Sequence, residues 1–326
     1  TCYSTIFALA SVAVALVWLH PLVTAPTWLA LTSLLAIATT AYGLITRAWT
    51  LAICGQIFLA VSAVEFFRQA FDVKPEWFFP LAPIAALGIF SFAAVGWFTR
   101  KPDATKAVRE PLLQLALAYR WIALLMSLVW IWDYVPERHL VWAYMAAGVV
   151  VFALALWRSN REALVATTVY VTASLTMLWW RDYLVMDVTW PNLFALLALF
   201  AMQQVLRRNA TKMPLAESIH GAVAIIAGLS LWRFVTCWVP TADLFLTMAW
   251  AGFALVIFTA GMLLRERFYR WFGLFVLAAS VGRVVAVDMW KAETIYRVLT
   301  IMALGVSLLL IGFVYNKFQD TIKKWL

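Results

Sequence analysis

The chain of 326 residues is 65% hydrophobic and 13% charged, and it carries a net charge of +9. Soluble domains contain about 25% charged residues, so this composition excludes a soluble globular domain. Apolar runs of about 20 residues recur along the chain, and each is long enough to cross a hydrocarbon core about 30 Å thick as a helix. We therefore predict an all-α, polytopic integral membrane protein in contact with the lipid bilayer.

Twelve apolar segments are candidate transmembrane helices, and we expect them to form successive helical hairpins. In chain order they cover about residues 4–23, 27–45, 49–67, 77–98, 112–132, 140–157, 163–180, 190–206, 215–238, 243–264, 270–289 and 295–316. Residues 1–316 are expected to form a single transmembrane domain. Residues 317–326 are expected to form an amphipathic interfacial tail, because Phe318, Ile322 and Trp325 recur at helical spacing beside lysines.

Basic residues are concentrated in alternate loops. The loops after even-numbered segments, with the C-terminal tail, hold sixteen of the 25 Lys and Arg residues, and the opposite loops hold six. The positive-inside rule then predicts that both termini are cytoplasmic. Because the charge serves membrane topology, no nucleic-acid partner is expected.

The basic loops also recur at a nearly regular interval of one hairpin. This spacing is typical of an internal repeat of two-helix units. Any evenly looped protein with twelve spans would show the same spacing, so the pattern leaves both explanations open.

Three arginines lie inside the predicted spans. Arg120 is the deepest, roughly 12 Å from the cytoplasmic end of its helix. Arg233 and Arg283 lie within about 10 Å of the opposite surface, a distance that a long side chain can mostly cover by snorkelling. An arginine at a helix centre costs roughly 2.5–3.5 kcal/mol, so each needs a partner, a water-filled cavity or a nearby interface.

The expected partners come from other segments. In an α-helix, Asp288 would lie about 140° around the axis from Arg283, too far for easy pairing. Glu65 and Asp243 are the acids at suitable depth for Arg283. The favoured pair is Asp288 with Arg297, which would close the last hairpin.

Residues with catalytic or ligand-binding chemistry are scarce. The chain has three histidines, three cysteines without CxxC spacing, and no nucleotide-binding, serine-hydrolase or zinc-protease motif. We expect no cofactor and no metal site. Asp182 and Asp187 form the one acidic cluster that suggests transferase chemistry.

The C-terminal part resembles a known family. The resemblance rests on Arg270, Gly273, Leu274, Arg283, Asp288, Tyr296, Arg297, Leu304, Gly305 and Tyr315. Their pattern is similar to that of the bacterial predicted membrane proteins called domain of unknown function 2339, which more usually have Lys at the position of Arg283. The resemblance implies a many-span protein of the bacterial inner membrane. It also groups Arg283, Asp288, Tyr296 and Arg297 in one arrangement, either a clasp or a binding site.

The leading hypothesis is therefore a non-enzymatic inner-membrane protein that serves as a structural or assembly subunit of a larger complex, with other membrane subunits as partners. A first alternative is a transporter or flippase for an anionic lipid-linked or envelope substrate, with Arg120, Arg233 and Arg283 along its path and a lipid or glycan headgroup as ligand. A second alternative is an envelope-modifying membrane transferase.

Overall fold

The computed structural model describes residues 2–46, 48–72, 74–99, 106–158, 161–183, 189–209, 214–239, 243–288 and 294–317. These residues are almost entirely helical, and no strand occurs among them. The chain divides into two compact units, Thr1–Glu137 and Arg138–Leu326, here called unit 1 and unit 2. The expected single domain over 1–316 stays a prediction, and the expected tail beyond Lys317 lies outside the described residues.

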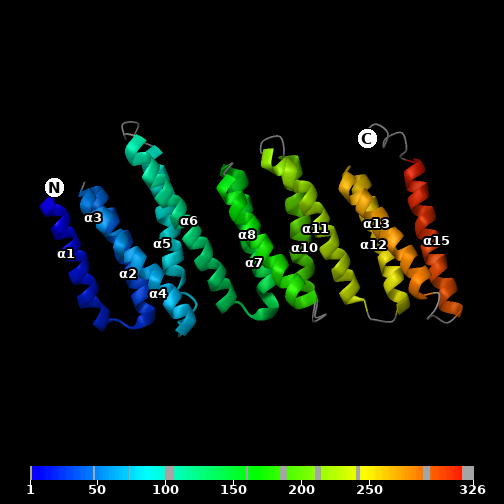
Figure 1. Cartoon of the computed structure of the whole chain (residues 1–326), viewed down its shortest axis with the longest axis horizontal. Coiled ribbons are helices and arrows are strands. Elements are labelled where there is room, and N and C mark those ends of the chain that lie inside the picture. Colours follow the sequence, from blue (N-terminus) through cyan, green and yellow to red (C-terminus); the bar gives the residue numbers. More distant parts are fainter. Residues whose placement is uncertain are drawn as a thin grey trace. The chain divides into compact units, whose positions relative to one another are not determined.

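Unit 1 is built around α2. Its elements are α1 (Cys2–Leu19), the short 3-10 turn η1 (His20–Leu22), α2 (Ala25–Ile45), α3 (Trp49–Cys54), α4 (Gln56–Asp72), α5 (Leu81–Thr99) and α6 (Lys106–Tyr134). Helix α2 packs on α3, α4 and α5, and α5 forms a hairpin with α6 (Figure 1). The core contains Leu29, Phe58, Leu87 and Met126. A buried hydrogen bond of 2.8 Å between the hydroxyls of Ser33 and Ser62 joins α2 to α4.

Unit 2 is a row of hairpins. Its elements are η2 (Glu137–His139), which begins in unit 1, then α7 (Leu140–Arg158), α8 (Arg161–Met177), η3 (Leu178–Asp182), α10 (Trp190–Arg208), α11 (Pro214–Trp238), α12 (Asp243–Leu263), α13 (Arg267–Arg283), η5 (Val284–Asp288) and α15 (Thr294–Lys317). Helices α7 and α8 pair, and α7 packs on α10, which pairs with α11; α11 packs on α12 and α13, and α12 packs on α15 (Figure 1). Packing between sequence neighbours is typical of repeat arrays.

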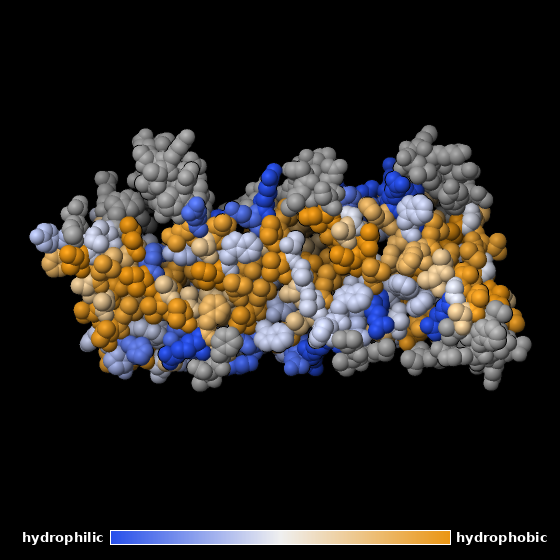
Figure 2. All heavy atoms as spheres, in the orientation of Figure 1, coloured by the Kyte–Doolittle hydropathy of each residue, from blue (hydrophilic) through white to orange (hydrophobic). Residues whose placement is uncertain are grey.

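The helices fit a membrane protein. In the part of the chain that the structure describes, eight helices are long and apolar enough to cross a bilayer, within Thr5–Leu22, Thr50–Ala70, Gln114–Tyr134, Glu137–Trp157, Arg161–Asp182, Ile219–Trp238, Phe245–Leu263 and Arg267–Ala286. Within each unit, apolar side chains occupy the middle of the helices, and polar side chains lie towards the helix ends (Figure 2). The all-α membrane class is therefore supported. The expected number of twelve spans stays a prediction.

The hairpins α7–α8 and α12–α13 of unit 2 share a pattern of buried positions. Buried residues of the first hairpin correspond to residues 106 positions later, as Leu178 corresponds to Val284. The paired positions are Val141 and Thr247, Met145 and Ala251, Gly148 and Ala254, Phe152 and Phe258, Thr167 and Gly273, Tyr170 and Val276, Ser174 and Ser280, and Leu178 and Val284, all of them buried. Two expected periods of one hairpin add up to about this separation. The shared pattern favours a true internal repeat over evenly spaced loops alone.

Both repeated hairpins end in π-helix. The segment Leu178–Asp182 follows α8, and Val284–Asp288 follows α13. A π-helix forms i→i+5 hydrogen bonds, so residues five positions apart lie close together along it. The expected angle between Arg283 and Asp288 assumed an α-helix and is wrong for this reason. The Asp288 side chain lies outside the described residues, so its partner stays a prediction.

Helices α12 and α13 approach closely enough to require glycine. An added Cβ on Gly273 would lie 2.9 Å from the Cβ of Phe258 and 3.0 Å from the carbonyl oxygen of Ala254. That carbonyl belongs to the helix backbone and cannot move aside without shifting α12. Small residues that let helix backbones approach closely are typical of packing in lipid.

We predict that Gly273→Ala destabilises the protein by about 1–3 kcal/mol, because the extra methyl group overpacks the contact between α12 and α13. Unfolding in mild detergent measures the change. The control is Gly282→Ala on the same helix, where no heavy atom lies within 4 Å of the added Cβ. Equal stability of the two variants would contradict the prediction.

Candidate functional site

Arg233 connects α11 to the segment that follows α8. Its Nη2 donates a hydrogen bond of 3.2 Å to the backbone carbonyl of Tyr183. Tyr183 is itself buried, and its hydroxyl donates to the carbonyl of Ser230, one turn before Arg233 on α11. The indole of Trp179 donates to the Ser230 hydroxyl at 3.0 Å. Arg233 thus belongs to a polar contact between two hairpins.

Arg283 lies against α12 and an aromatic group. Its Nε donates a hydrogen bond of 3.0 Å to the hydroxyl of buried Thr247, and its guanidinium carbon lies 5.4 Å from the centre of the Trp250 ring. The Trp250 ring is in turn 4.9 Å from that of Trp232 on α11, and its indole N–H donates to Thr236. A cation over a tryptophan contributes about 0.5–2 kcal/mol, depending on its burial, and Arg283 is half-buried. The aromatic group therefore offsets part of the cost of placing Arg283 in the membrane.

The structure thus connects the two arginines to different neighbours, Arg233 to the segment after α8 and Arg283 to α12. Among the contacts that the described residues show, these arginines meet a carbonyl, a hydroxyl and an aromatic ring, all of which are neutral groups. The acid expected for Arg283 was Glu65 or Asp243. The Asp243 side chain lies outside the described residues, so this pairing stays a prediction.

In unit 1, Glu65 is engaged within its own helix. Its carboxylate lies 3.7 Å from Nη1 of Arg68 and accepts a 3.0 Å hydrogen bond from Nε2 of Gln69. The Gln69 amide also donates to the carbonyl of Ala25 at 2.6 Å. Glu65 therefore helps to fix the contact between α4 and the start of α2.

Arg120 is half-buried on α6, six positions inside the apolar stretch Gln114–Tyr134. That places it about 9 Å from the start of this stretch. The preceding residue, Tyr119, donates to Oε1 of Gln56 at 2.8 Å, and Gln56 donates to Thr40 at 2.9 Å. Arg120 thus lies next to a polar connection between α6, α4 and α2.

The remaining predicted site residues are Asp288, Tyr296 and Arg297, and their side chains lie outside the described residues. The repeat offers a precedent for the predicted clasp between Asp288 and Arg297. Asp182 ends the first π-helix as Asp288 ends the second, and it accepts a 2.6 Å hydrogen bond from Asn192 in the first turn of the following helix. Arg297 also lies in the first turn of the following helix, α15, one position before Val298, which is the residue 106 positions after Asn192. Asp187, the other acid of the expected cluster, also lies outside the described residues.

The sequence analysis missed a buried ion pair of unit 2, between Arg207 and Glu266. Nη1 of Arg207 lies 2.9 Å from Oε2 of Glu266, whose side chain is only 4% exposed. The same guanidinium donates 2.8 Å hydrogen bonds to the carbonyls of Leu264 and Arg265. The signal was a lone acid between two arginines in the loop sequence Arg265-Glu266-Arg267, which had been counted only as part of a basic loop.

These bonds stabilise a tight turn. Arg265 has a φ of 56°, in the left-handed region that favours glycine. The amide of Glu266 donates to the carbonyl of Gly261 at 2.8 Å, and that of Arg265 donates to Met262 at 3.3 Å, which together form a Schellman motif. Arg207 therefore connects the end of α10 to the turn between α12 and α13.

Next to this ion pair lies a buried hydrogen-bond network. The hydroxyl of Tyr269 donates to Oε1 of Gln203 at 2.6 Å, and Nε2 of Gln204 donates to the same Oε1 at 2.8 Å. Gln203 is fully buried and Tyr269 is 4% exposed. Polar side chains that bond across helices replace part of the missing hydrophobic driving force in lipid.

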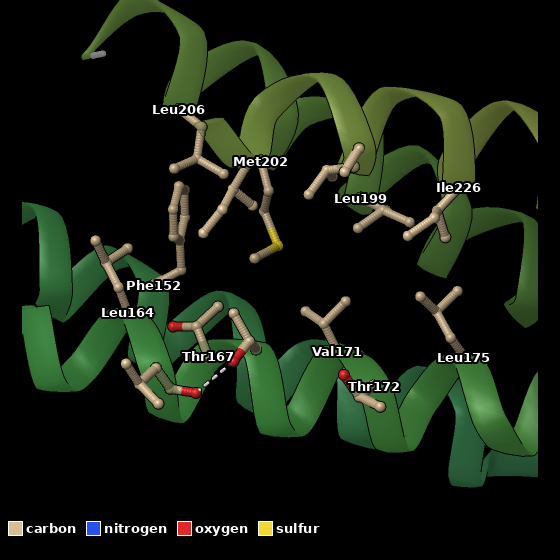
Figure 3. A pocket seen from close by; sticks show the side chains of 15 residues that line it. Phe152, Leu164, Thr167, Val171, Thr172, Leu175, Leu199, Met202, Leu206 and Ile226 are labelled. Atoms are coloured by element: carbon tan, nitrogen blue, oxygen red, sulfur yellow. Dashed lines mark hydrogen bonds between the residues drawn. The ribbon is translucent and has the colours of Figure 1, made fainter. Parts of the chain in front are cut away.

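A deep groove opens between the first two hairpins of unit 2. It has a volume of about 330 Å³. Side chains of α8 and of α10 and α11 face each other across it (Figure 3). Its lining is Phe152, Leu164, Val165, Thr167, Thr168, Val171, Thr172, Leu175, Leu199, Met202, Leu206, Ile219, Ala222, Val223 and Ile226. No charged side chain belongs to this lining.

Metal chemistry finds no support among the described residues, where no three His, Cys, Asp or Glu side chains gather. The fold defines a helical membrane protein built from hairpins. No family model, curated protein or solved structure matches the chain. The resemblance of its C-terminal part to the domain of unknown function 2339 therefore stays a prediction.

We predict that Arg207→Leu destabilises the protein by about 3–5 kcal/mol, because it leaves the Glu266 carboxylate buried without its partner. Adding Glu266→Leu recovers part of that loss, since the double variant buries no charge. A double-mutant cycle on unfolding in detergent measures the coupling. Arg208→Leu is the control, an exposed neighbour expected to change stability by less than about 0.5 kcal/mol. Additive effects of Arg207 and Glu266 would sink the prediction.

For Arg283 we predict that Arg283→Lys lowers stability by about 1–3 kcal/mol although the charge remains, because lysine lacks the Nε–H that reaches Thr247 and the planar group that lies over Trp250. The measurement is again unfolding in detergent. The control is Arg267→Lys at the exposed start of α13. If both substitutions have the same small effect, the geometry of the guanidinium is irrelevant to the fold.

Proposed function

We propose that the protein is a non-enzymatic structural or assembly subunit of a larger membrane complex. The carrying observation is the row of hairpins in unit 2, in which each hairpin packs on its sequence neighbours. Such arrays leave long faces uncovered, and repeat proteins use these faces to bind partners. Partner subunits within the membrane are therefore the ligands that this architecture suits.

The arrangement of the charges supports the same proposal. Arg233, Arg283 and Arg207 each contact groups of neighbouring helices. Their guanidinium groups serve helix-to-helix contacts in unit 2, as expected of charges that stabilise a fold. A transport path instead needs polar groups directed to a cavity.

The alternative is a transporter or flippase for an anionic lipid-linked substrate. The groove between α8 and α10–α11 is the feature that could hold such a substrate. Its lining is apolar, and a headgroup that crosses the membrane needs polar groups along its way. The groove therefore suits the apolar part of a lipid better than the transfer of its headgroup. The scaffold remains the preferred function.

The proposed location is the bacterial inner membrane, with the arginine-rich loops and both termini in the cytoplasm. At this edge of unit 2 lie the end of α10 with Arg207 and Arg208, and the start of α13 with Arg267. The exposed Trp157 lies near the end of α7, and the exposed Trp271 lies near the start of α13. Tryptophans at such positions anchor a protein at the membrane surface.

We predict that a photo-crosslinking residue at exposed Leu197 on α10 or Phe275 on α13 forms one protein adduct of defined mass in native membranes. The same partner is expected at a fixed ratio when the membrane is extracted as lipid nanodiscs without detergent. Mass photometry and peptide sequencing measure both. The control is Leu199 on α10, which is buried and should give no protein adduct from outside the chain.

Two results would contradict the scaffold. One is a chain that is monomeric in native nanodiscs and crosslinks to lipid alone from both exposed positions. The other is rapid flipping of a fluorescent phospholipid in vesicles that contain the purified protein, especially if Arg120→Leu abolishes it without loss of folding. That second result would establish the transporter.

A further inference from the structure

We propose that the groove between α8 and α10–α11 is a binding site for an anionic phospholipid of the leaflet on the arginine-rich side. One acyl chain lies in the groove, and the phosphate is held at its mouth by Arg161. This inference goes beyond the scaffold function and does not depend on it.

The walls of the groove match a hydrocarbon chain. Leu175, Met202 and Leu206 line it with aliphatic side chains (Figure 3). Two of the three threonine hydroxyls on its α8 wall are used by their own helix, since Thr167 donates to the carbonyl of Ala163 at 2.8 Å and Thr168 to that of Val165 at 2.7 Å. These residues present mainly methyl groups to the groove.

The length and position of the groove match one leaflet. Its α8 wall runs from Leu164 to Leu175, which is about 16 Å along the helix. Half of a hydrocarbon core about 30 Å thick is about 15 Å. Leu164 lies one turn from the start of α8, and Leu206 lies one turn from the end of α10. The groove therefore extends from the arginine-rich edge to about the middle of the bilayer.

A phosphate at the mouth meets an available cation. Arg161 is the first residue of α8, and at 100° per residue it lies on the same face of this helix as Leu164, Thr168 and Leu175 of the groove. It is exposed, and it forms no ion pair or hydrogen bond with another described residue. The positive end of the α8 dipole adds to its attraction for an anion. Glu162, also exposed, is the one acid of the first turn of α8.

A lipid fits the groove better than a transmembrane helix does. The volume of about 330 Å³ is near the lower end of small-molecule sites, and an acyl chain is one methylene wide. A helix with its side chains is about 10–12 Å across, which is too wide for the groove. Such a helix would contact only the rim of the groove with its side chains. The lining also lacks glycine, the residue that most favours close helix packing in lipid.

The test uses the full chain reconstituted in phosphatidylcholine vesicles with a trace of photoactivatable phosphatidylglycerol or photoactivatable phosphatidylcholine. Both probes carry the diazirine in the middle of one acyl chain, and mass spectrometry maps the labelled peptides. We expect phosphatidylglycerol to label α8, α10 and α11 at the groove more than phosphatidylcholine does, by about fivefold for the contribution of one arginine. Equal labelling by the two probes would overturn the proposal, because it would show ordinary boundary lipid.

Two variants separate the headgroup contact from the groove. Arg161→Gln removes the preference for phosphatidylglycerol and leaves the groove intact. Arg267→Gln is the matched control, since Arg267 begins α13 as Arg161 begins α8 and lies 106 positions later in the repeat. Val171→Trp fills the groove and is expected to abolish labelling there while other labelled peptides remain. A preference that survives Arg161→Gln, or labelling by phosphatidylglycerol that the Arg267 change abolishes equally, contradicts the site. So does a protein adduct at the groove in native membranes, which would show a partner helix instead.

Discussion

The ion pair between Arg207 and Glu266 is the contact on which the middle of unit 2 depends. It joins α10 to the turn between α12 and α13, so that one guanidinium serves a carboxylate and two carbonyls at once. Lipid supplies no hydrophobic drive for helices to associate, because lipid tails are as apolar as leucine. Polar contacts and close packing must do this instead. The network of Gln203 and Tyr269 beside the pair and the close approach at Gly273 serve the same end.

The repeat explains why these contacts recur at similar depth. A hairpin in a row must present one face to the hairpin before it and another to the one after it. The shared burial pattern of α7–α8 and α12–α13 agrees with this requirement. The π-helices that follow α8 and α13 are a second feature that the two hairpins share. Ser174 and Ser280 hold corresponding places. Their hydroxyls are both satisfied by backbone carbonyls, Ser174 by Val141 of the paired helix and Ser280 by Leu277 of its own. The two serines thus occupy the same position in the repeat but donate to different helices.

The sequence predicts the all-α membrane class, because a backbone in lipid must satisfy its hydrogen bonds within each span. It also identifies Arg233 and Arg283 as residues that need compensation. It does not identify what compensates them, since Thr247, Trp250 and the Tyr183 carbonyl are neutral and lie on other segments. Arg207 and Glu266 were overlooked because the positive-inside rule accounts for loop charges without reference to their contacts. The π-helices escape prediction because five residues are too few to reveal a change of period.

The depth of the arginines decides whether they require a water-filled path. The cost of roughly 2.5–3.5 kcal/mol applies at the helix centre, whereas Arg283 lies three positions from the end of the apolar stretch Arg267–Ala286. A hydrogen bond from a charged donor contributes about 1.5–3 kcal/mol, and the Trp250 ring adds to it. These contributions are as large as the cost, so no aqueous cavity is needed to explain the charge. When the arginines inside the spans bind neighbouring helices, the surface that faces the acyl chains is apolar and cannot distinguish one lipid headgroup from another. The protein can then recognise a particular lipid only through the basic residues at the ends of its helices.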